Sequence, residues 1–208
     1  MVNHANGSDR LFSALGRKRV VVGFPSSAGE IEKSVDVYVD VVEQPTVIER
    51  NAPDVAAMIR KAGFRVTLVG DVDSWLKRHA VFVTAVGGAI LKSNGDALLL
   101  SADKELVRTF ILAIREGWSA LDRIGVGPAT LALRTIFCWI PLPIAVAYWR
   151  RLFGSARGEY YSARHTRHAP AEMDALAADV RLLIRDAQTP HLRLLYAAFD
   201  DRCRGKSE

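Results

Sequence analysis

The sequence predicts an α+β protein in which an incomplete α/β piece is followed by an all-helical domain. The length of 208 residues allows one large domain or two small ones. Before Gly70, short segments rich in β-branched residues dominate, whereas after Gly70 the apolar residues recur at helical spacing. We therefore expect an α/β segment over residues 1–70, too short for a complete doubly wound sheet, and a helical domain over residues 71–208.

The α/β segment is predicted to contain four strands and one helix. The expected strands cover residues 19–25, 35–40, 45–49 and 64–68. The second of these alternates valine with more polar residues, which is the period of a strand with one buried face. Between the last two strands, Asn51 is expected to cap a helix that ends at Gly63. Its inward residues are predicted to be Val55, Met58 and Ile59.

Two long helices are predicted directly after Gly70. Either Asp71 or Asp73 is expected to cap the first of them. Ser101 is expected to cap the second, which ends at Gly125. Its apolar stripe consists of Leu106, Val107, Phe110, Ile111, Ile114, Trp118 and Leu121.

Proline punctuates the remainder of the chain. A proline-interrupted helical pair is predicted over residues 128–153. Pro170 opens the next helix in its first turn, and Thr189-Pro190 starts a final helix that runs through Phe199. The buried face of the helix after Pro170 is predicted to hold Met173, Leu176, Ala177, Val180, Leu183 and Ile184.

Composition and charge argue against nucleic acids and membranes as binding partners. The chain has 28 Lys and Arg against 23 Asp and Glu, and this net charge of +5 is spread rather than clustered, so we expect no nucleic-acid partner. The longest uncharged runs, residues 80–91 and 135–149, are shorter than the roughly 20 residues of a membrane span, so we expect no membrane partner. Two cysteines without a C-x-x-C pair and a polar start without an apolar signal core lead us to expect a cytoplasmic protein.

Five motifs follow one another along the chain. They are Asn6-Gly7, Val22 to Gly29, Asp73 to His79, Pro170 to Asp174, and Thr189-Pro190 followed by Leu194-Leu195-Tyr196. In this order they resemble segments from the later two-thirds of the ketopantoate reductases (2-dehydropantoate 2-reductases), which are NADPH-dependent enzymes of pantothenate biosynthesis. The resemblance implies the tail end of a Rossmann-type nucleotide-binding domain. It also implies a helical domain of the type found at the C-terminus of 6-phosphogluconate dehydrogenase.

The chain departs from the family pattern in two ways. No G-x-G-x-x-G turn follows an early strand, and such a turn holds the pyrophosphate of the dinucleotide at a helix start. The nearest match, Gly125-Val126-Gly127, is predicted to be a helix end and a loop. In addition, Val81 and Ala85 stand where the family has asparagines, and Tyr160 stands at the family's substrate-binding serine. We therefore expect weak or no NADPH binding by this chain alone, and the identity of the keto acid stays open.

Lys77 is the catalytic residue that the resemblance implies. Reduction of a ketone builds negative charge on its oxygen, and a positioned acid must deliver a proton or stabilise that charge. Val81 and Ala85 follow Lys77 at one and two helical turns, so an apolar lining would desolvate the ammonium group. The alternative is an ordinary lysine that reaches into solvent from an amphipathic helix.

Four further residues are expected to contact the substrate. The resemblance gives Glu172 as acceptor of a substrate hydroxyl and Asn6 as a contact of the substrate or of the nicotinamide ribose. Glu172 is also suited to stabilise a helix start, and Asn6-Gly7 is a common turn pair, so both structural readings stay open. Ser162 lies near the position of the family serine, and Arg164 is a candidate to hold an acidic substrate. No metal site is expected, because His165 and His168 are flanked by arginines and lack a completing carboxylate or thiolate.

Two functions compete. The first is the substrate-side portion of an NADPH-dependent reductase of a 2-keto acid, which is truncated or needs a separate nucleotide-binding part. The second is a non-catalytic dimerisation or ligand-binding module derived from the same family. In both, a homodimer through the helical domain is expected. Whether Met1 is the true start stays open.

Overall fold

The computed structural model describes residues 5–25, 27–32, 35–40 and 45–204. Their folding divides the chain into two compact units, each with its own apolar core. The first unit runs from Gly7 to Leu76, and the second contains Ala5, Asn6 and the described residues from Lys77 onward. The division falls inside a helix, whereas the sequence analysis drew the boundary after Gly70. The reason is that Val72, Trp75 and Leu76, in the first turns of that helix, are buried with the core of the first unit.

The first unit contains a small mixed sheet and three short helical elements. Its elements are α1 (Asp9–Leu15), the 3₁₀-helix η1 (Arg17–Arg19), β1 (Gly23–Phe24), β4 (Thr46–Glu49), α2 (Pro53–Lys61) and β5 (Val66–Val69). The sheet has the order β1-β4-β5, in which β1 pairs antiparallel with β4, and β4 pairs parallel with β5. Because α2 connects two parallel neighbours, β4-α2-β5 is a βαβ unit. A separate antiparallel hairpin consists of β2 (Ser27–Glu32) and β3 (Val35–Asp40).

Three local predictions for this unit need correction. The strand predicted over residues 19–25 shortens to Gly23–Phe24. The carbonyl of Val20 accepts a hydrogen bond from the Arg17 guanidinium and not from the backbone of a neighbouring strand. The predicted helix takes Ala52, not Asn51, as its N-cap, and Pro53 fixes its first turn. Met58 is 71% exposed, because the buried face of α2 is centred on Ala56. The alternating valines do form a strand, β3.

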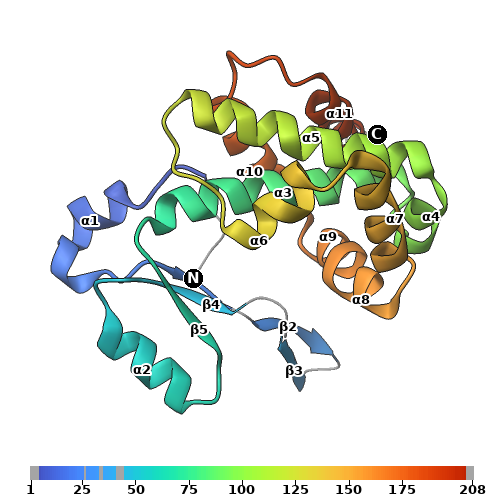
Figure 1. Cartoon of the computed structure of the whole chain (residues 1–208). Helices are drawn as coiled ribbons and strands as arrows, with labels where there is room; N and C mark the ends of the chain where they lie inside the picture. Colours follow the sequence, from blue (N-terminus) through green and yellow to red (C-terminus); the bar gives the residue numbers. More distant parts are fainter. Residues whose placement is uncertain (1–4, 26, 33–34, 41–44, 205–208) are drawn as a thin grey trace. The chain divides into compact units, whose positions relative to one another are not determined.

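The second unit is helical. Its elements are α3 (Val72–Lys92), α4 (Ala97–Ala102), α5 (Lys104–Arg123), α6 (Leu131–Arg134), the π-helix η2 (Thr135–Trp139), α7 (Leu142–Phe153), α8 (Ala156–Gly158), the π-helix η3 (Glu159–Arg164), α9 (His165–His168), α10 (Pro170–Leu183) and α11 (Pro190–Arg204). Figure 1 shows α5 packed along α11 and, at its other side, against α7. No helix in the described part of the chain is both long enough and apolar enough to cross a membrane.

Side-chain caps decide where the long helices begin. Asp71 caps α3, because its carboxylate accepts the Ser74 amide (2.8 Å), whereas Asp73 accepts the Ser8 hydroxyl (2.8 Å). Asp103, not Ser101, caps α5 by accepting the Leu106 amide at 2.8 Å. Ser101 is instead the penultimate residue of α4, a helix that the sequence analysis did not predict. The apolar stripe of α5 is buried as predicted, apart from the half-buried Leu106.

The core of the helical unit depends on close helix packing. A Cβ atom on Gly88 of α3 would lie 2.7 Å from the Leu195 carbonyl oxygen of α11. A Cβ atom on Gly87 would lie 2.4 Å from the Met173 side chain of α10. The two glycines therefore let α10 and α11 approach the middle of α3 more closely than any larger residue would allow.

Candidate functional site

Lys77 is half-buried on α3, and the helical face beyond it is part of the core. Val81 and Ala85, which follow it at one and two turns, are both fully buried. Val81 packs against Gly117 of α5, where a Cβ atom would lie 2.5 Å from its methyl group. The predicted apolar lining is thus a helix–helix contact, and neither residue is accessible to a substrate.

Arg78, the neighbour of Lys77, is a buried anchor that the sequence analysis did not single out. Its guanidinium donates to the carbonyls of Gly127 (2.5 Å) and Val126 (2.9 Å) and to the carboxylate of Asp122 (2.5 Å). Its own carbonyl accepts the indole N–H of Trp118 at 3.1 Å. These bonds tie the end of α5 and the loop after it to α3, one residue away from Lys77. The predicted helix end at Gly125 is confirmed by its positive φ of 79°.

Glu172 lies in the first turn of α10 and is exposed. The residue after it, Met173, is buried against Gly87 of α3. Lys77 and Gly87 are ten residues apart, which corresponds to roughly 15 Å along the helix axis. The first turn of α10 therefore packs on α3 about three turns beyond Lys77.

Asn6 belongs to the helical unit although it stands near the start of the chain. The preceding Ala5 is fully buried in the core of that unit, and Asn6 itself is exposed. Gly7 has a φ of 78°, in the left-handed region that glycine favours, and the backbone bends at Ala5 and Asn6. Asn6, Lys77 and Glu172 are thus members of one compact unit.

Ser162 and Arg164 lie together in the π-helix η3. Ser162 is half-buried, and its carbonyl accepts the hydroxyl of Thr166 at 2.8 Å. The Arg164 guanidinium lies over the ring of Tyr160, 5.2 Å from its centroid. Helices of the π type are rare overall, and where they occur they are often found at functional sites.

His79 is the most strongly perturbed titratable group in this region. It is buried on α3, and burial together with the charge of nearby His165 lowers its pKa to about 3. Its ring lies 6.1 Å from that of Phe82. His79 is therefore a neutral imidazole at ordinary pH. The sequence analysis did not predict this burial, although the position of His79 directly before the uncharged run of residues 80–91 is a signal that could have indicated it.

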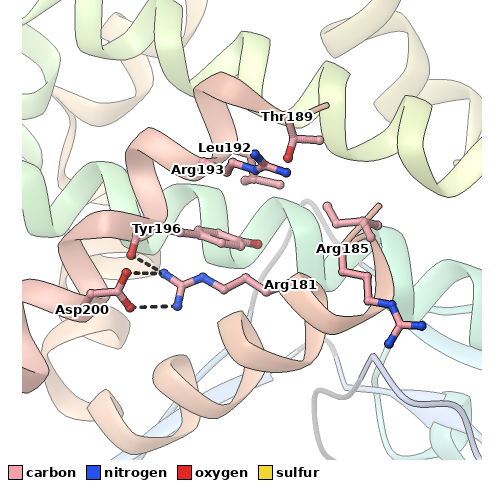
Figure 2. Close-up of a pocket in the computed structure, with 8 residues that line it drawn as sticks. Arg181, Arg185, Thr189, Leu192, Arg193, Tyr196 and Asp200 are labelled. Carbon is pink, nitrogen blue, oxygen red and sulfur yellow. Dashed lines mark hydrogen bonds and ion pairs between the residues drawn. The ribbon is translucent and has the colours of Figure 1, made fainter. Parts of the chain in front are cut away.

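A cavity of about 350 Å³ opens between α10 and α11, and none of the catalytic or substrate-binding residues predicted from the sequence lines it. Its lining consists of Arg181, Ile184, Arg185, Thr189, Leu192, Arg193, Tyr196 and Asp200. Figure 2 shows Arg181 extended from α10 toward Asp200 on α11, while Arg193 lies beside Thr189 on the other side of Tyr196. Buried Tyr196 bonds through its hydroxyl to Thr84 of α3 (2.6 Å), and burial raises its pKa.

The described residues contain no group of three or more His, Cys, Asp or Glu side chains that could hold a metal ion. The described residues also contain no glycine-rich turn of the kind that binds a dinucleotide. Gly125 and Gly127 follow the end of α5, not a strand that leads into a helix. In the described ranges, then, nothing fits the pyrophosphate of NADPH in the manner of a glycine-rich turn.

Comparison with known proteins does not assign the chain to a family. No protein-family model matches it, and neither does any curated protein or solved structure. The function must therefore be inferred from the residues and their geometry.

Proposed function

We propose that the chain is the substrate-side portion of an NADPH-dependent oxidoreductase similar to the ketopantoate reductases, which reduces a 2-keto acid to a 2-hydroxy acid. The observation that carries the proposal is that Asn6, Lys77 and Glu172 belong to one compact unit. These are the three residues that the sequence resemblance matches to substrate-contacting positions.

Two features of the architecture support the same proposal. The parallel β4-α2-β5 unit is of the kind that builds nucleotide-binding sheets, which agrees with a Rossmann remnant. It leads directly into α3, the long helix that carries Lys77. A helical domain of the 6-phosphogluconate dehydrogenase type is part of this proposal.

Each residue has a distinct role in the proposed reaction. Lys77, as an ammonium group, donates a proton to the ketone oxygen, which becomes a hydroxyl group as the carbon is reduced. Glu172 is exposed and accepts a hydrogen bond from a substrate hydroxyl, while the Asn6 amide orients the acid. NADPH would supply the hydride if a separate nucleotide-binding part held it, since the described residues do not fit its pyrophosphate.

The test combines the full chain with a separately produced nucleotide-binding domain of a ketopantoate reductase. NADPH oxidation is followed with ketopantoate as the probe substrate. We expect ketopantoate-dependent oxidation, and we expect Lys77→Ala to lower kcat by at least about 100-fold because the proton donor is lost. The matched control is Lys92→Ala, which removes an exposed lysine from the end of the same helix and should leave the rate unchanged.

Equal rates for the two lysine variants, or no oxidation that depends on ketopantoate, would contradict the proposal. Calorimetric titration of the chain alone with NADPH tests the assignment of the cofactor to a separate part. Micromolar binding would show that assignment to be wrong. Circular dichroism of each variant establishes that α3 has remained folded.

The second candidate is a non-catalytic dimerisation or ligand-binding module. The complete burial of Val81 and Ala85 favours it, because these positions cannot contact a substrate from within the core. A folded chain that binds ketopantoate equally well with and without Lys77, and that turns over none, would support this candidate against the first.

A further inference from the structure

The cavity between α10 and α11 has the chemistry of an anion site. We propose that it binds the phosphoryl group of a small ligand, at a place separate from Asn6, Lys77 and Glu172. None of these three residues lines the cavity, so this inference does not depend on the proposed reductase function. Its volume of about 350 Å³ lies within the range of small-molecule sites.

The charge of the lining is positive. Arg181, Arg185 and Arg193 face a single acidic lining residue, Asp200, which leaves a net charge of +2. Asp200 is committed to Arg181, since its two carboxylate oxygens accept from Nη1 and Nη2 of that guanidinium at 2.8 and 3.0 Å. Arg193 has no carboxylate partner among the described residues, and Arg185 contacts Asp186 at 3.5 Å in an exposed pair, so the charges of these two arginines are accessible to a ligand.

In the described ranges, Arg193 is held by one hydrogen bond, and its other guanidinium N–H groups are available to a ligand. Its Nη2 donates to the carbonyl of Ala187 at 3.1 Å, which fixes the side chain across the connection between the two helices. Nε and Nη1 of Arg193 bond to no other residue in the described part of the chain. A guanidinium presents its donors in a planar fork that matches two oxygens of one phosphoryl group.

Two further groups complete the site. The hydroxyl of Thr189, which is only 4% exposed as a residue, lines the cavity and has no hydrogen-bond partner among the described residues. Arg185 extends away from Arg193 in Figure 2, and its contact with Asp186, at 3.5 Å, joins two largely exposed side chains. Such an exposed pair contributes little, so a rotamer change that brings Arg185 to an anion costs little.

The floor of the cavity limits what the rest of the ligand can be. Leu192, Ile184 and Tyr196 form it and are almost fully buried, and Arg181 covers the Tyr196 ring at 5.3 Å. These three side chains make the floor apolar, so the polar contacts of the ligand come from the arginines and Thr189. The net charge of +2 is matched by a phosphoryl group, which carries about −1.5 to −2 at neutral pH, better than by a carboxylate.

The test is a titration of the full chain with inorganic phosphate at constant ionic strength. Amide ¹H–¹⁵N shifts locate the binding site. We expect saturable shifts at Thr189, His191 and Arg193, and a weaker response in a parallel titration with acetate. Arg193→Ala should weaken phosphate binding by about tenfold or more, because two charge-assisted hydrogen bonds are lost.

The matched control is Arg204→Ala, which removes the same charge from the far end of α11, where the arginine is paired with Asp201. It should leave the affinity unchanged. Arg193→Lys keeps the charge but loses the fork, so it should bind phosphate more weakly than the wild type and more strongly than Arg193→Ala. Should Arg193→Ala fail to fold, Arg185→Ala takes its place.

Three outcomes would overturn the proposal. Shifts that do not saturate show that there is no site. Equal weakening by the Arg193 and Arg204 variants shows that phosphate responds only to overall charge. Acetate binding as strong as phosphate binding shows that the phosphoryl assignment is wrong and that the cavity takes carboxylates.

Discussion

Two neighbouring residues of α3, Arg78 and His79, show how differently burial treats two bases. The buried guanidinium of Arg78 donates to two backbone carbonyls and to the Asp122 carboxylate. His79 is instead kept neutral, because desolvation of its imidazole opposes protonation. Arg78 therefore fixes the end of α5, while His79 makes the stability of the helical unit depend on pH.

We predict that His79 destabilises the folded chain in acid. The folded pKa is about 3 and the ordinary value is 6.5, so between these values the unfolded chain binds a proton that the folded chain excludes. The free energy of unfolding should therefore fall as the pH drops from 6.5 toward 3. This group alone contributes at most about 1.4 kcal/mol per pH unit.

Denaturant unfolding at a series of pH values measures this dependence. His79→Gln should have a shallower slope than the wild type, because glutamine does not titrate. His168→Gln changes an exposed histidine and should retain the wild-type slope. Parallel slopes for the wild type and His79→Gln would show that His79 does not carry the effect.

At the scale of elements, close approach is what assembles the helical unit. Helix caps and apolar stripes, which can both be identified in the local sequence, determine where each long helix forms. These helices are α3, α5, α10 and α11. Their mutual packing depends on positions without a side chain, such as Gly88 and Gly117. At these positions a poor helix former is retained because nothing larger fits.

We predict that Gly88→Ala destabilises the protein although alanine favours helices by about 1 kcal/mol over glycine. The new methyl group would lie 2.7 Å from the backbone carbonyl of Leu195, which cannot turn away as a side chain would. A net loss of about 1–3 kcal/mol in the free energy of unfolding is expected.

Thermal and denaturant unfolding of the variant give the measurement. Gly70→Ala is the control, because its Cβ atom would meet nothing within 4 Å and its φ is not in the left-handed region. A Gly88→Ala variant as stable as the wild type would show that α11 can move away from α3 at no cost.

At the scale of the whole molecule, the two units have unequal cores. The buried cluster of the first unit consists of Val22, Val47, Val72, Trp75 and Leu76. The second unit buries a much larger cluster, which includes the aromatic residues Phe110, Phe137, Trp149 and Phe153. Because apolar burial is the main stabilising contribution, the helical unit should be the more stable of the two.

Native-state hydrogen exchange tests this difference. We predict that the amides of β4 and β5 open at a lower free energy than the buried amides of α5, such as those of Ile111 and Ile114. Equal opening free energies in both sets would mean that the chain unfolds as a single cooperative body.

Part of the candidate site was within reach of the sequence. Lys77, Glu172 and Asn6 were named from motif resemblance, and helical spacing predicted that Val81 and Ala85 follow Lys77 on one face. Helical spacing does not show which other elements pack against that face. It therefore gave no indication that both residues are buried against α5 and the rest of the core. The cavity lined by Arg181, Arg185 and Arg193 could not be predicted from the sequence either, because it forms only where the end of α10 packs against α11.

By itself the sequence determined the general α+β class of the fold, the positions of its long helices and the strand β3, since periodicity, caps and prolines act over a few neighbouring residues. Only the tertiary structure decided which aspartate caps α3, that Met58 faces outward, and which arginines surround a common cavity. The physical reason is that burial and charge pairing depend on residues far apart in the chain, such as Arg181 and Asp200, whose meeting no local pattern encodes.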